Sequence, residues 1–173
     1  MQILIKQVRV GQYGKPFTIY KFRTMKKSTD RLFQNWNKNS NTMNTVCDET
    51  FNKYAEPDLR VTKVGKFLRK TGIDELPQFY NIVRGEMTLI GPRPILPAFQ
   101  DKCFSPEQIA LRQKYKPGLI AVGYSGPTSD QVSVIKNEMV YLREREQGNR
   151  FLVNVKYFFK VAFNLLSGRA KNV

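Results

Sequence analysis

The stretch from Gly65 to Pro94 reads GKFLRKTGIDELPQFYNIVRGEMTLIGPRP, and the rest of the chain is organised around it. Two adjacent carboxylates, Asp74 and Glu75, follow a basic run, and a further arginine, Arg93, lies between two prolines. The basic run consists of Lys63, Lys66, Arg69 and Lys70. Cations on both sides of an acidic pair suit a site for a metal-bound phosphate, because negative charge spreads over the oxygens of a transferred phosphoryl group.

Helices are expected on both sides of the acidic pair. Apolar spacing predicts one helix over residues 61–70, and Gly72 is a typical residue to follow its end. A second helix is expected to begin at Asp74 as N-cap and to end at Gly85, with Pro77 in its first turn, where a missing N–H costs little. Its apolar face would consist of Leu76, Phe79, Tyr80 and Val83.

The pKa of Asp74 is expected to be lowered, because a helix N-terminus and nearby cations both favour the ionised carboxylate. A simpler interpretation makes Asp74 only a helix cap and Glu75 a helper in the first turn, and spacing alone does not decide between the two. Arg93 also allows two interpretations. The flanking prolines either present its guanidinium to a ligand with little freedom to lose, or form an ordinary proline-rich turn.

Residues 2–10 and 15–25 alternate in hydrophobicity around the turn sequence GQYG, which predicts a β-hairpin. Lys21 and Arg23 would share one face of its second strand, since residues two apart point to the same side. They are either solvated charges on a half-exposed strand or ligands for phosphate. The polar segment 28–55 reads as an excursion without chemistry, and residues 86–90 as a short strand.

Three helices are expected in the C-terminal half, over residues 105–115, 129–147 and 150–166, with a connector over 119–127. The last helix is apolar around most of its circumference, apart from a polar row of Lys156, Lys160 and Asn164. It is either a helix lying in the plane of a membrane interface or a buried core helix.

The composition limits the classes of function. The 173 residues fit one domain, and 29 basic against 14 acidic residues give a net charge of +15, which indicates an anionic partner. Histidine is absent, so carboxylates, Lys, Tyr or Cys must carry any proton transfer. Two distant cysteines, Cys47 and Cys103, suggest a reducing compartment, in which a disulfide between them is not expected.

Three segments together resemble the bacterial sugar transferases, the monotopic polyprenyl-phosphate hexose-1-phosphate transferases or phosphoglycosyl transferases. The segments are KPFTIYKFRTM (15–25), LRKTGIDELPQFYNIVRGEMTLIGPRP (68–94) and KYKPGL (114–119). The resemblance covers essentially the whole chain. It implies transfer of a sugar-1-phosphate from a UDP-sugar to polyprenyl (undecaprenyl) phosphate, with release of UMP, to initiate a bacterial surface glycan such as a capsule, exopolysaccharide or O-antigen.

The resemblance also implies roles for individual residues. Asp74 would be the nucleophile that becomes a covalent phosphosugar intermediate, and Glu75 would support it and bind Mg²⁺. Four basic residues would hold phosphate oxygens: Lys21, Arg23, Arg69 and Arg93. Six further residues would support the site: Pro77, Gln78, Asn81, Gly91, Pro92 and Pro94.

Two features depart from the family pattern. Family members usually carry a hydrophobic N-terminal helix that enters and leaves the same leaflet, whereas this sequence begins at Met1-Gln2-Ile3 without it. The sequence is then either a piece of a longer protein or a shortened member that holds the membrane by other surfaces. After KPGL, a variant of TGxAQ-x-x-GR is usual, but here the chain reads IAVGYSGPTS (120–129), in a region tied to donor recognition.

The expected fold is a single α+β domain over residues 1–173, with a small N-terminal hairpin packed by helices, some amphipathic and membrane-facing. The expected location is the cytoplasmic face of the bacterial inner membrane, on anionic lipid. The sequence does not decide whether the protein forms a homodimer. Two alternatives remain. One is a non-catalytic shortened homologue that binds a membrane or partner; the other, less favoured because no nucleic-acid module is recognised, is a basic nucleic-acid-binding domain.

Overall fold

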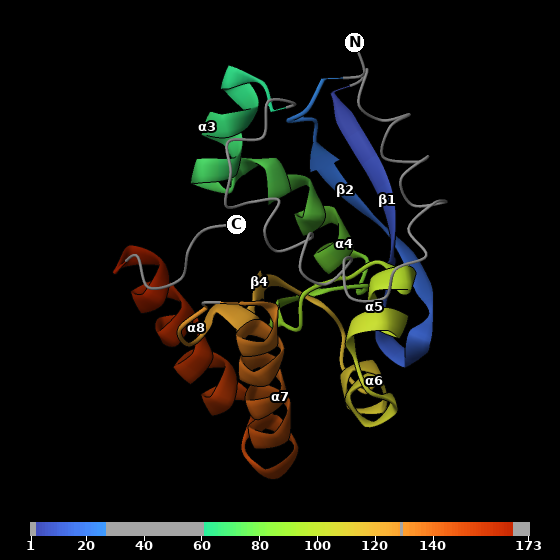
Figure 1. The fold of residues 1–173 in the computed structure, drawn as a ribbon, viewed down its shortest axis with the longest axis vertical. Coiled ribbons are helices and arrows are strands. Elements are labelled where there is room, and N and C mark those ends of the chain that lie inside the picture. The colour runs from blue at the N-terminus through green and yellow to red at the C-terminus, as the bar shows by residue number, and fades with distance from the viewer. Residues whose placement is uncertain (1–2, 27–60, 129, 168–173) are drawn as a thin grey trace.

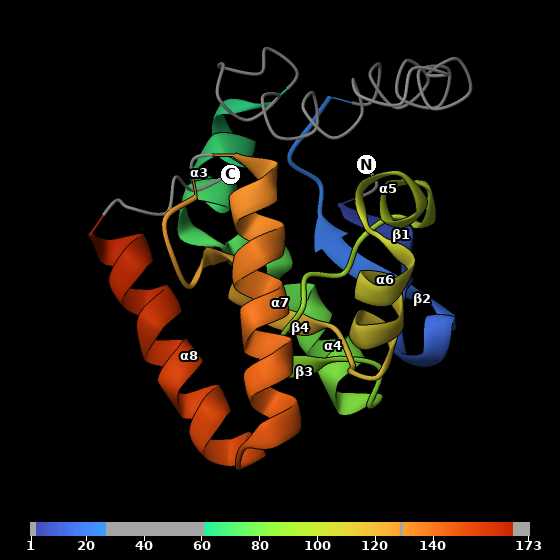
Figure 2. The ribbon, with the colours of Figure 1, turned by 60° about the horizontal axis from the view of Figure 1, so that its bottom comes forward.

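The computed structural model describes residues 3–26, 61–128 and 130–167, and within them it has the expected α+β architecture (Figure 1). The N-terminal hairpin and the last two helices lie on opposite sides of the molecule, with a short central sheet between them (Figure 2). The segment 28–55, expected to be a polar excursion, lies outside the described residues.

The predicted hairpin is confirmed by strands β1 (Leu4–Val10) and β2 (Pro16–Phe22), which pair antiparallel around the short 3₁₀ turn η1 (Gln12–Gly14). The odd-numbered residues of both strands share one face, because cross-strand partners and residues two apart point the same way. Ile19 in the middle of that face is only 1% exposed. The same face carries Arg9 at one end and Lys21 at the other.

The acidic pair lies in a 3₁₀ turn and not at the start of an α-helix. Helix α3 (Lys63–Thr71) begins after Thr62 and ends at Gly72, whose φ of 70° closes it as expected. The turn η2 (Ile73–Gln78) follows at once, and α4 (Phe79–Val83) continues from it. The prediction of Asp74 as N-cap is therefore wrong. Pro77 has no N–H for an i−4 carbonyl, which favours the tighter turn.

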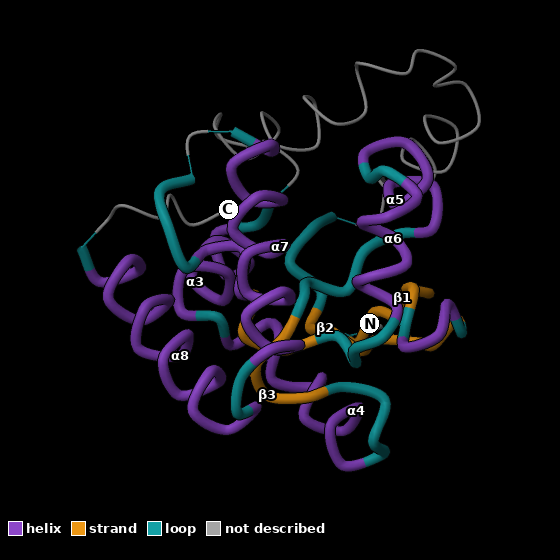
Figure 3. The backbone as a smooth tube through the Cα atoms, turned by 90° about the horizontal axis from the view of Figure 1, so that it is seen from below, coloured by secondary structure: helices purple, strands orange, loops and turns teal. Residues whose placement is uncertain are grey.

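A second, parallel sheet forms the centre of the molecule. Strand β3 (Thr88–Gly91), predicted from residues 86–90, pairs with β4 (Gly118–Ala121), which lies partly within the expected connector. Gly91 and Gly118 meet so closely that a Cβ on Gly118 would lie 2.0 Å from the Gly91 nitrogen. Seen from below, β3 runs between α4 and α8 (Figure 3). The close pairing fixes where the following Pro-Arg-Pro segment begins.

The remaining elements are mostly those expected. Helix α6 (Pro106–Gln113) has a capping box between Ser105 and Gln108, and the long helices are α7 (Gln131–Gln147) and α8 (Arg150–Leu166). Two short elements were not predicted, namely α5 (Pro97–Cys103) and the 3₁₀ turn η3 (Val122–Tyr124).

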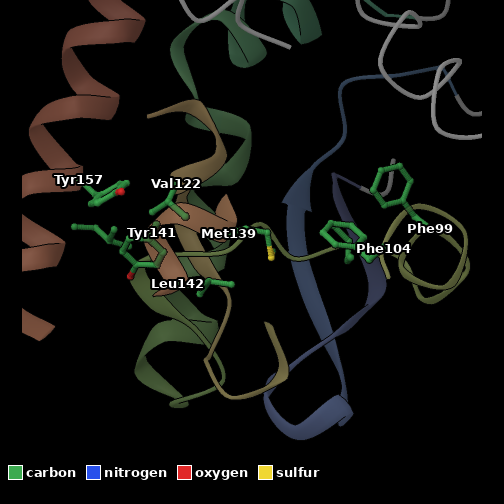
Figure 4. Close-up of a cluster of buried hydrophobic side chains, with 9 residues drawn as sticks. Phe99, Phe104, Val122, Met139, Tyr141, Leu142 and Tyr157 are labelled. Carbon is green, nitrogen blue, oxygen red and sulfur yellow. The ribbon is translucent and has the colours of Figure 1, made fainter. Parts of the chain in front are cut away.

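The main hydrophobic core is formed by residues between Ile90 and Tyr157 (Figure 4). Tyr141 of α7 and Tyr157 of α8 meet edge to face, with ring centroids 4.9 Å apart. Phe99 and Phe104 form a similar pair at 6.2 Å on the side of α5. The core connects these pairs through Ile90, Ile95, Val122, Met139 and Leu142.

Helix α8 is only partly buried. Tyr157, Val161 and Asn164 face the rest of the protein, so Asn164 does not belong to an exposed polar row. Several large apolar side chains of the same helix are exposed, namely Phe151, Leu152, Val155, Phe158, Phe159, Phe163, Leu165 and Leu166. The reading of α8 as a wholly buried core helix is therefore wrong. Within the described chain, no helix is long and apolar enough to cross a membrane.

Cys103 at the end of α5 is disulfide-bonded, contrary to the expectation for the cysteines.

Candidate functional site

The acidic pair lies beside the hairpin. Lys21, near the end of β2, donates from Nζ to Glu75 Oε1 at 2.5 Å, and both side chains are partly exposed. Asp74 precedes Glu75 in the same turn and is half-buried. Turn η2 packs against β2, so the fold brings together a strand and a turn that are 54 residues apart along the chain. The structure thus places Lys21 beside the acidic pair, and its role as a phosphate ligand stays a prediction.

Burial raises the pKa of Asp74, and the adjacent charge of Glu75 raises it further. The cations Lys21 and Arg69 lower it but do not outweigh these two effects. The prediction of a lowered pKa is therefore wrong. The sequence shows the cations and the helix start, but it does not show how much water the fold removes from the carboxylate.

The pKa of Glu75 shifts in the opposite direction. Burial alone would raise the pKa of Glu75, but the charges of Lys21 and Arg93 and the hydrogen bond from Lys21 lower it overall. Arg9 adds to this lowering. The two neighbouring carboxylates thus have different environments, one favouring protonation and one favouring ionisation. Such divergence is a common mark of functional sites.

Arg69 is held in place by the loop after β2. Its Nε donates to Thr24 Oγ1 at 3.0 Å, and Thr24 is 5% exposed. The Thr24 carbonyl accepts from the Thr62 N–H at 3.0 Å, where α3 begins. Gly65 packs against that carbonyl so tightly that a Cβ would lie 2.0 Å from its oxygen. These contacts fix the face of α3 that presents Arg69 near Asp74.

The backbone of Arg93 is held by a buried ion pair that sequence reasoning missed. The Arg93 N–H donates to Glu138 Oε2 at 3.1 Å, and its carbonyl accepts from Arg112 Nη2 at 2.7 Å. Arg112 and Glu138 also bind each other directly, and both are almost fully buried. Burial lowers the pKa of Arg112 to about 9, which still leaves the guanidinium charged at neutral pH.

The guanidinium of Arg93 is held separately. Its Nη1 donates to the hydroxyl of Tyr124 in η3, and its Cζ lies 5.8 Å from the centre of that ring. The charge of Arg93 also lowers the pKa of Glu75. Tyr124 was not predicted as a site residue. Its only sequence signal was its place in the segment that departs from the family pattern.

The other predicted residues have mixed placements. Arg23 is half-buried just beyond β2, where its N–H donates to the Ile3 carbonyl at 2.7 Å, and its role as a phosphate ligand stays a prediction. Asn81 is completely buried and donates from Nδ2 to the Thr18 carbonyl and to Glu86 Oε2, each at 2.7 Å. It joins α4 to β2 and so acts on the site only indirectly.

The proposed supporting residues around them are mostly interior. Gln78, Gly91 and Pro92 are buried, while Pro77 and Pro94 are half-buried. Arg9 was not predicted as a site residue. The alternation that placed Lys21 would also have placed Arg9 on the inner face, once the register of the hairpin was known.

The acidic residues offer few metal ligands. Within the described residues, no group of three or more His, Cys, Asp or Glu side chains could hold a metal ion. Two adjacent carboxylates nevertheless suit Mg²⁺, which uses one or two carboxylates and fills its other positions with water and substrate phosphates. Asp74 and Glu75 therefore fit a metal shared with a phosphorylated substrate, and no closed protein cage is needed.

Known proteins resemble the chain over nearly all its length. The model of a family described as bacterial sugar transferase matches residues 1–167. A UDP-glucose:undecaprenyl-phosphate glucose-1-phosphate transferase of Klebsiella pneumoniae is 35% identical over 169 residues, which are 93% of this chain and 32% of that protein. A galactosyl transferase of Streptococcus agalactiae is 35% identical over 144 residues, covering 82% of this chain and 30% of that protein.

A third relative differs in the sugar it is named for. The UDP-N-acetylgalactosamine-undecaprenyl-phosphate N-acetylgalactosaminephosphotransferase of Aeromonas hydrophila is 31% identical over 173 residues, 96% of this chain and 36% of that protein. The chain therefore spans about a third of the length of these relatives. The names of these relatives all describe transfer of a sugar or a sugar phosphate, but they name different sugars. Similarity alone therefore does not identify the sugar that this chain would use.

Proposed function

The chain belongs to the bacterial sugar transferase family, and from this membership we propose that it transfers a sugar-1-phosphate from a UDP-sugar to polyprenyl phosphate, releasing UMP. The observation that carries the proposal is the meeting of an acidic pair with several cations. Lys21 and Arg69 act on Asp74, while Lys21, Arg93 and Arg9 act on Glu75. Such a site can hold a diphosphate and present a carboxylate to it.

The proposed reaction has two displacements. In the first, a carboxylate oxygen of Asp74 forms a bond to the sugar-bearing phosphorus, and the bond between that phosphorus and the bridging oxygen breaks, so UMP leaves with the electron pair. In the second, a phosphate oxygen of polyprenyl phosphate attacks the same phosphorus and the bond to Asp74 breaks. The carboxylate is restored, and a soluble donor and a lipid acceptor use one site in turn.

The environment of Asp74 supports its role as the nucleophile. The raised pKa makes its carboxylate more basic, and therefore more reactive toward phosphorus once it is ionised. Lys21, Arg69 and Arg93 would each face the phosphate oxygens as charge develops in the transition state. Arg23 is proposed to join them from the loop after β2.

We propose Mg²⁺ as the cofactor, with Glu75 as a ligand beside Asp74. When bound, the ion would neutralise the diphosphate and make UMP a better leaving group. Glu75 is ionised more readily than an ordinary glutamate, as a metal ligand must be. Its partner Lys21 would then turn from the carboxylate to a phosphate oxygen, a change that the partial exposure of both side chains allows.

The site of action is proposed to be the cytoplasmic face of the bacterial inner membrane, since the acceptor is a lipid. Three helical segments carry exposed apolar side chains that would enter the interface: α3, η2–α4 and α8. The first two contribute Val64, Phe67, Leu76, Phe79, Tyr80 and Val83. The charge of +15 supports binding to anionic lipid, where each basic residue near the surface contributes roughly 1 kcal/mol. Initiation of a surface glycan follows from the reaction.

The test is release of UMP with Mg²⁺, undecaprenyl phosphate in detergent and a panel of UDP-sugars, for the wild type and Asp74→Asn. We expect release with one or a few donors and its loss in the variant. If no donor supports release but the protein binds anionic vesicles or a full-length transferase, the chain is a non-catalytic module. Salt-sensitive binding to generic nucleic acid, without UMP release, would instead favour the nucleic-acid alternative.

A further inference from the structure

We propose that Tyr124 is a positioning residue: its hydroxyl fixes the orientation of the Arg93 guanidinium, and Asn164 of α8 holds Tyr124 in place. The inference about geometry stands on the contacts of these residues. Its consequence for substrate binding rests on the proposed function.

The main chain of Arg93 has little freedom. Pro92 and Pro94 restrict the backbone on both sides, and both polar backbone groups of Arg93 are bound by the buried pair of Glu138 and Arg112. An arginine side chain nevertheless keeps several rotatable bonds, whose ordering on binding carries an entropy cost. A fixed backbone alone therefore does not aim the guanidinium.

Tyr124 supplies the missing restraint. Its hydroxyl accepts a hydrogen bond from Arg93 Nη1, and its ring centre lies 5.8 Å from Arg93 Cζ. The contact joins two segments 31 residues apart. A bond at one end of the planar guanidinium fixes its rotation, so its other N–H groups keep a set direction.

Tyr124 is itself held from two sides. Val122 and Gly123 in the same turn are buried, and the Gly123 carbonyl accepts from Asn137 Nδ2 of α7 at 3.0 Å. The Tyr124 carbonyl accepts from Asn164 Nδ2 of α8 at 3.4 Å. Asn164 is 7% exposed, a buried amide on a helix that is otherwise largely apolar. The aromatic C-terminal helix is thus connected through Asn164 and Tyr124 to Arg93.

These contacts end at the guanidinium of Arg93, whose charge lowers the pKa of Glu75. A guanidinium aimed by Tyr124 would meet a phosphate oxygen beside Glu75 without first paying the entropy of ordering. Preorganisation of this kind improves binding of the substrate and its transition state. Tyr124 therefore acts through Arg93 and needs no contact with the substrate.

The direct test is NMR of arginine side chains labelled with ¹⁵N, with the Arg93 signal assigned by its loss in Arg93→Lys. In the wild type, rotation about the Nε–Cζ bond of Arg93 should be slow, and Tyr124→Phe should speed it by about tenfold or more. The matched control is Tyr141→Phe, which removes the hydroxyl bound by Arg145 Nη1 at 3.0 Å elsewhere in the core. That control should leave the Arg93 signal unchanged. Equal rotation rates of Arg93 in the wild type and Tyr124→Phe would overturn the inference.

Kinetics test the consequence for the reaction. For Tyr124→Phe we expect the KM for the UDP-sugar to rise about five- to tenfold with a smaller change in kcat, since one charge-assisted hydrogen bond is lost. In an Arg93→Lys background the same substitution should have no further effect. An equal loss in both backgrounds would show that Tyr124 acts independently of Arg93 and contradict the inference. Absence of UMP release in the wild type would refute the proposed function, while the NMR comparison would still decide the role of Tyr124.

Discussion

Two ion pairs near the site differ in their contact with water. Lys21 and Glu75 keep 22% and 34% of their side chains exposed, whereas Arg112 and Glu138 keep 7% and 3%. An exposed pair can exchange its partner for water or a ligand at little cost, because water screens both charges. A buried pair cannot, since each charge without its partner would lack solvation. We therefore propose that the first pair serves the reacting site, whereas the second pair holds the backbone of Arg93.

Breaking the buried pair is the strongest test of this contrast. Arg112→Met leaves the carboxylate of Glu138 buried and uncompensated, so we expect the free energy of unfolding to fall by about 3–5 kcal/mol. The double variant Arg112→Met/Glu138→Met should regain most of that stability in urea unfolding. It should still lose at least about tenfold in UMP release, because the backbone of Arg93 loses both partners. A stable double variant with full activity would show that the pair does not position Arg93.

The partly exposed pair of Lys21 and Glu75 should behave in the opposite way. Lys21→Met or Glu75→Gln should change the free energy of unfolding by no more than about 1 kcal/mol. Either change should lower UMP release by about a hundredfold, because one charged group near the phosphate is lost. Lys114→Met, which breaks an exposed pair between the residue that follows α6 and Glu146 of α7, provides the control and should keep full activity. Parallel losses of stability and activity in the Lys21 variant would refute the distinction.

The two carboxylates should also respond differently to pH. Since the charge of Glu75 helps to raise the pKa of Asp74, Glu75→Gln should lower the pKa of Asp74. A ¹³C NMR titration of the carboxyl groups can measure this shift. In the wild type, UMP release should fall on acidification, because Asp74 becomes protonated. The fall should occur at a higher pH than for an aspartate with the ordinary pKa of 3.8. An unchanged Asp74 pKa in Glu75→Gln would contradict the coupling.

A smaller effect concerns stability. The pKa of Glu75 is lower in the folded protein than its ordinary value of 4.5, so ionised Glu75 stabilises the fold at pH values above 4.5. This contribution to the free energy of unfolding is lost as the pH falls below 4.5. The stability difference between the wild type and Glu75→Gln should therefore shrink on acidification. Urea unfolding at several pH values measures it, and a difference that grows toward low pH would have the wrong sign.

The same contrast explains what could be predicted from the sequence. Local signals sufficed for the hairpin, for the helix that starts after Ser105, for Gly72 and for the bounds of α8. A place for Lys21 in the site followed only from the family resemblance. Strand alternation alone could not distinguish a phosphate ligand from a solvated charge. These features depend on nearby residues or on motifs whose order the chain itself displays.

Long-range contacts could not be predicted. Three contacts join segments that are 26 to 31 residues apart in sequence. They are the parallel pairing of β3 and β4, the ion pair of Arg112 and Glu138, and the contact of Tyr124 with Arg93. No periodicity marks such partners. The error about the pKa of Asp74 has the same origin, because burial is a property of the whole fold.

The most direct test of the account is a single-turnover experiment with a UDP-sugar and Mg²⁺ but no polyprenyl phosphate. We predict a burst of UMP, up to one per protein molecule, and a matching gain in protein mass equal to one sugar phosphate, located by peptide analysis at Asp74. Addition of polyprenyl phosphate should then remove that mass. Full activity with the acceptor, but neither a burst nor a modified Asp74 without it, would contradict the two-step mechanism.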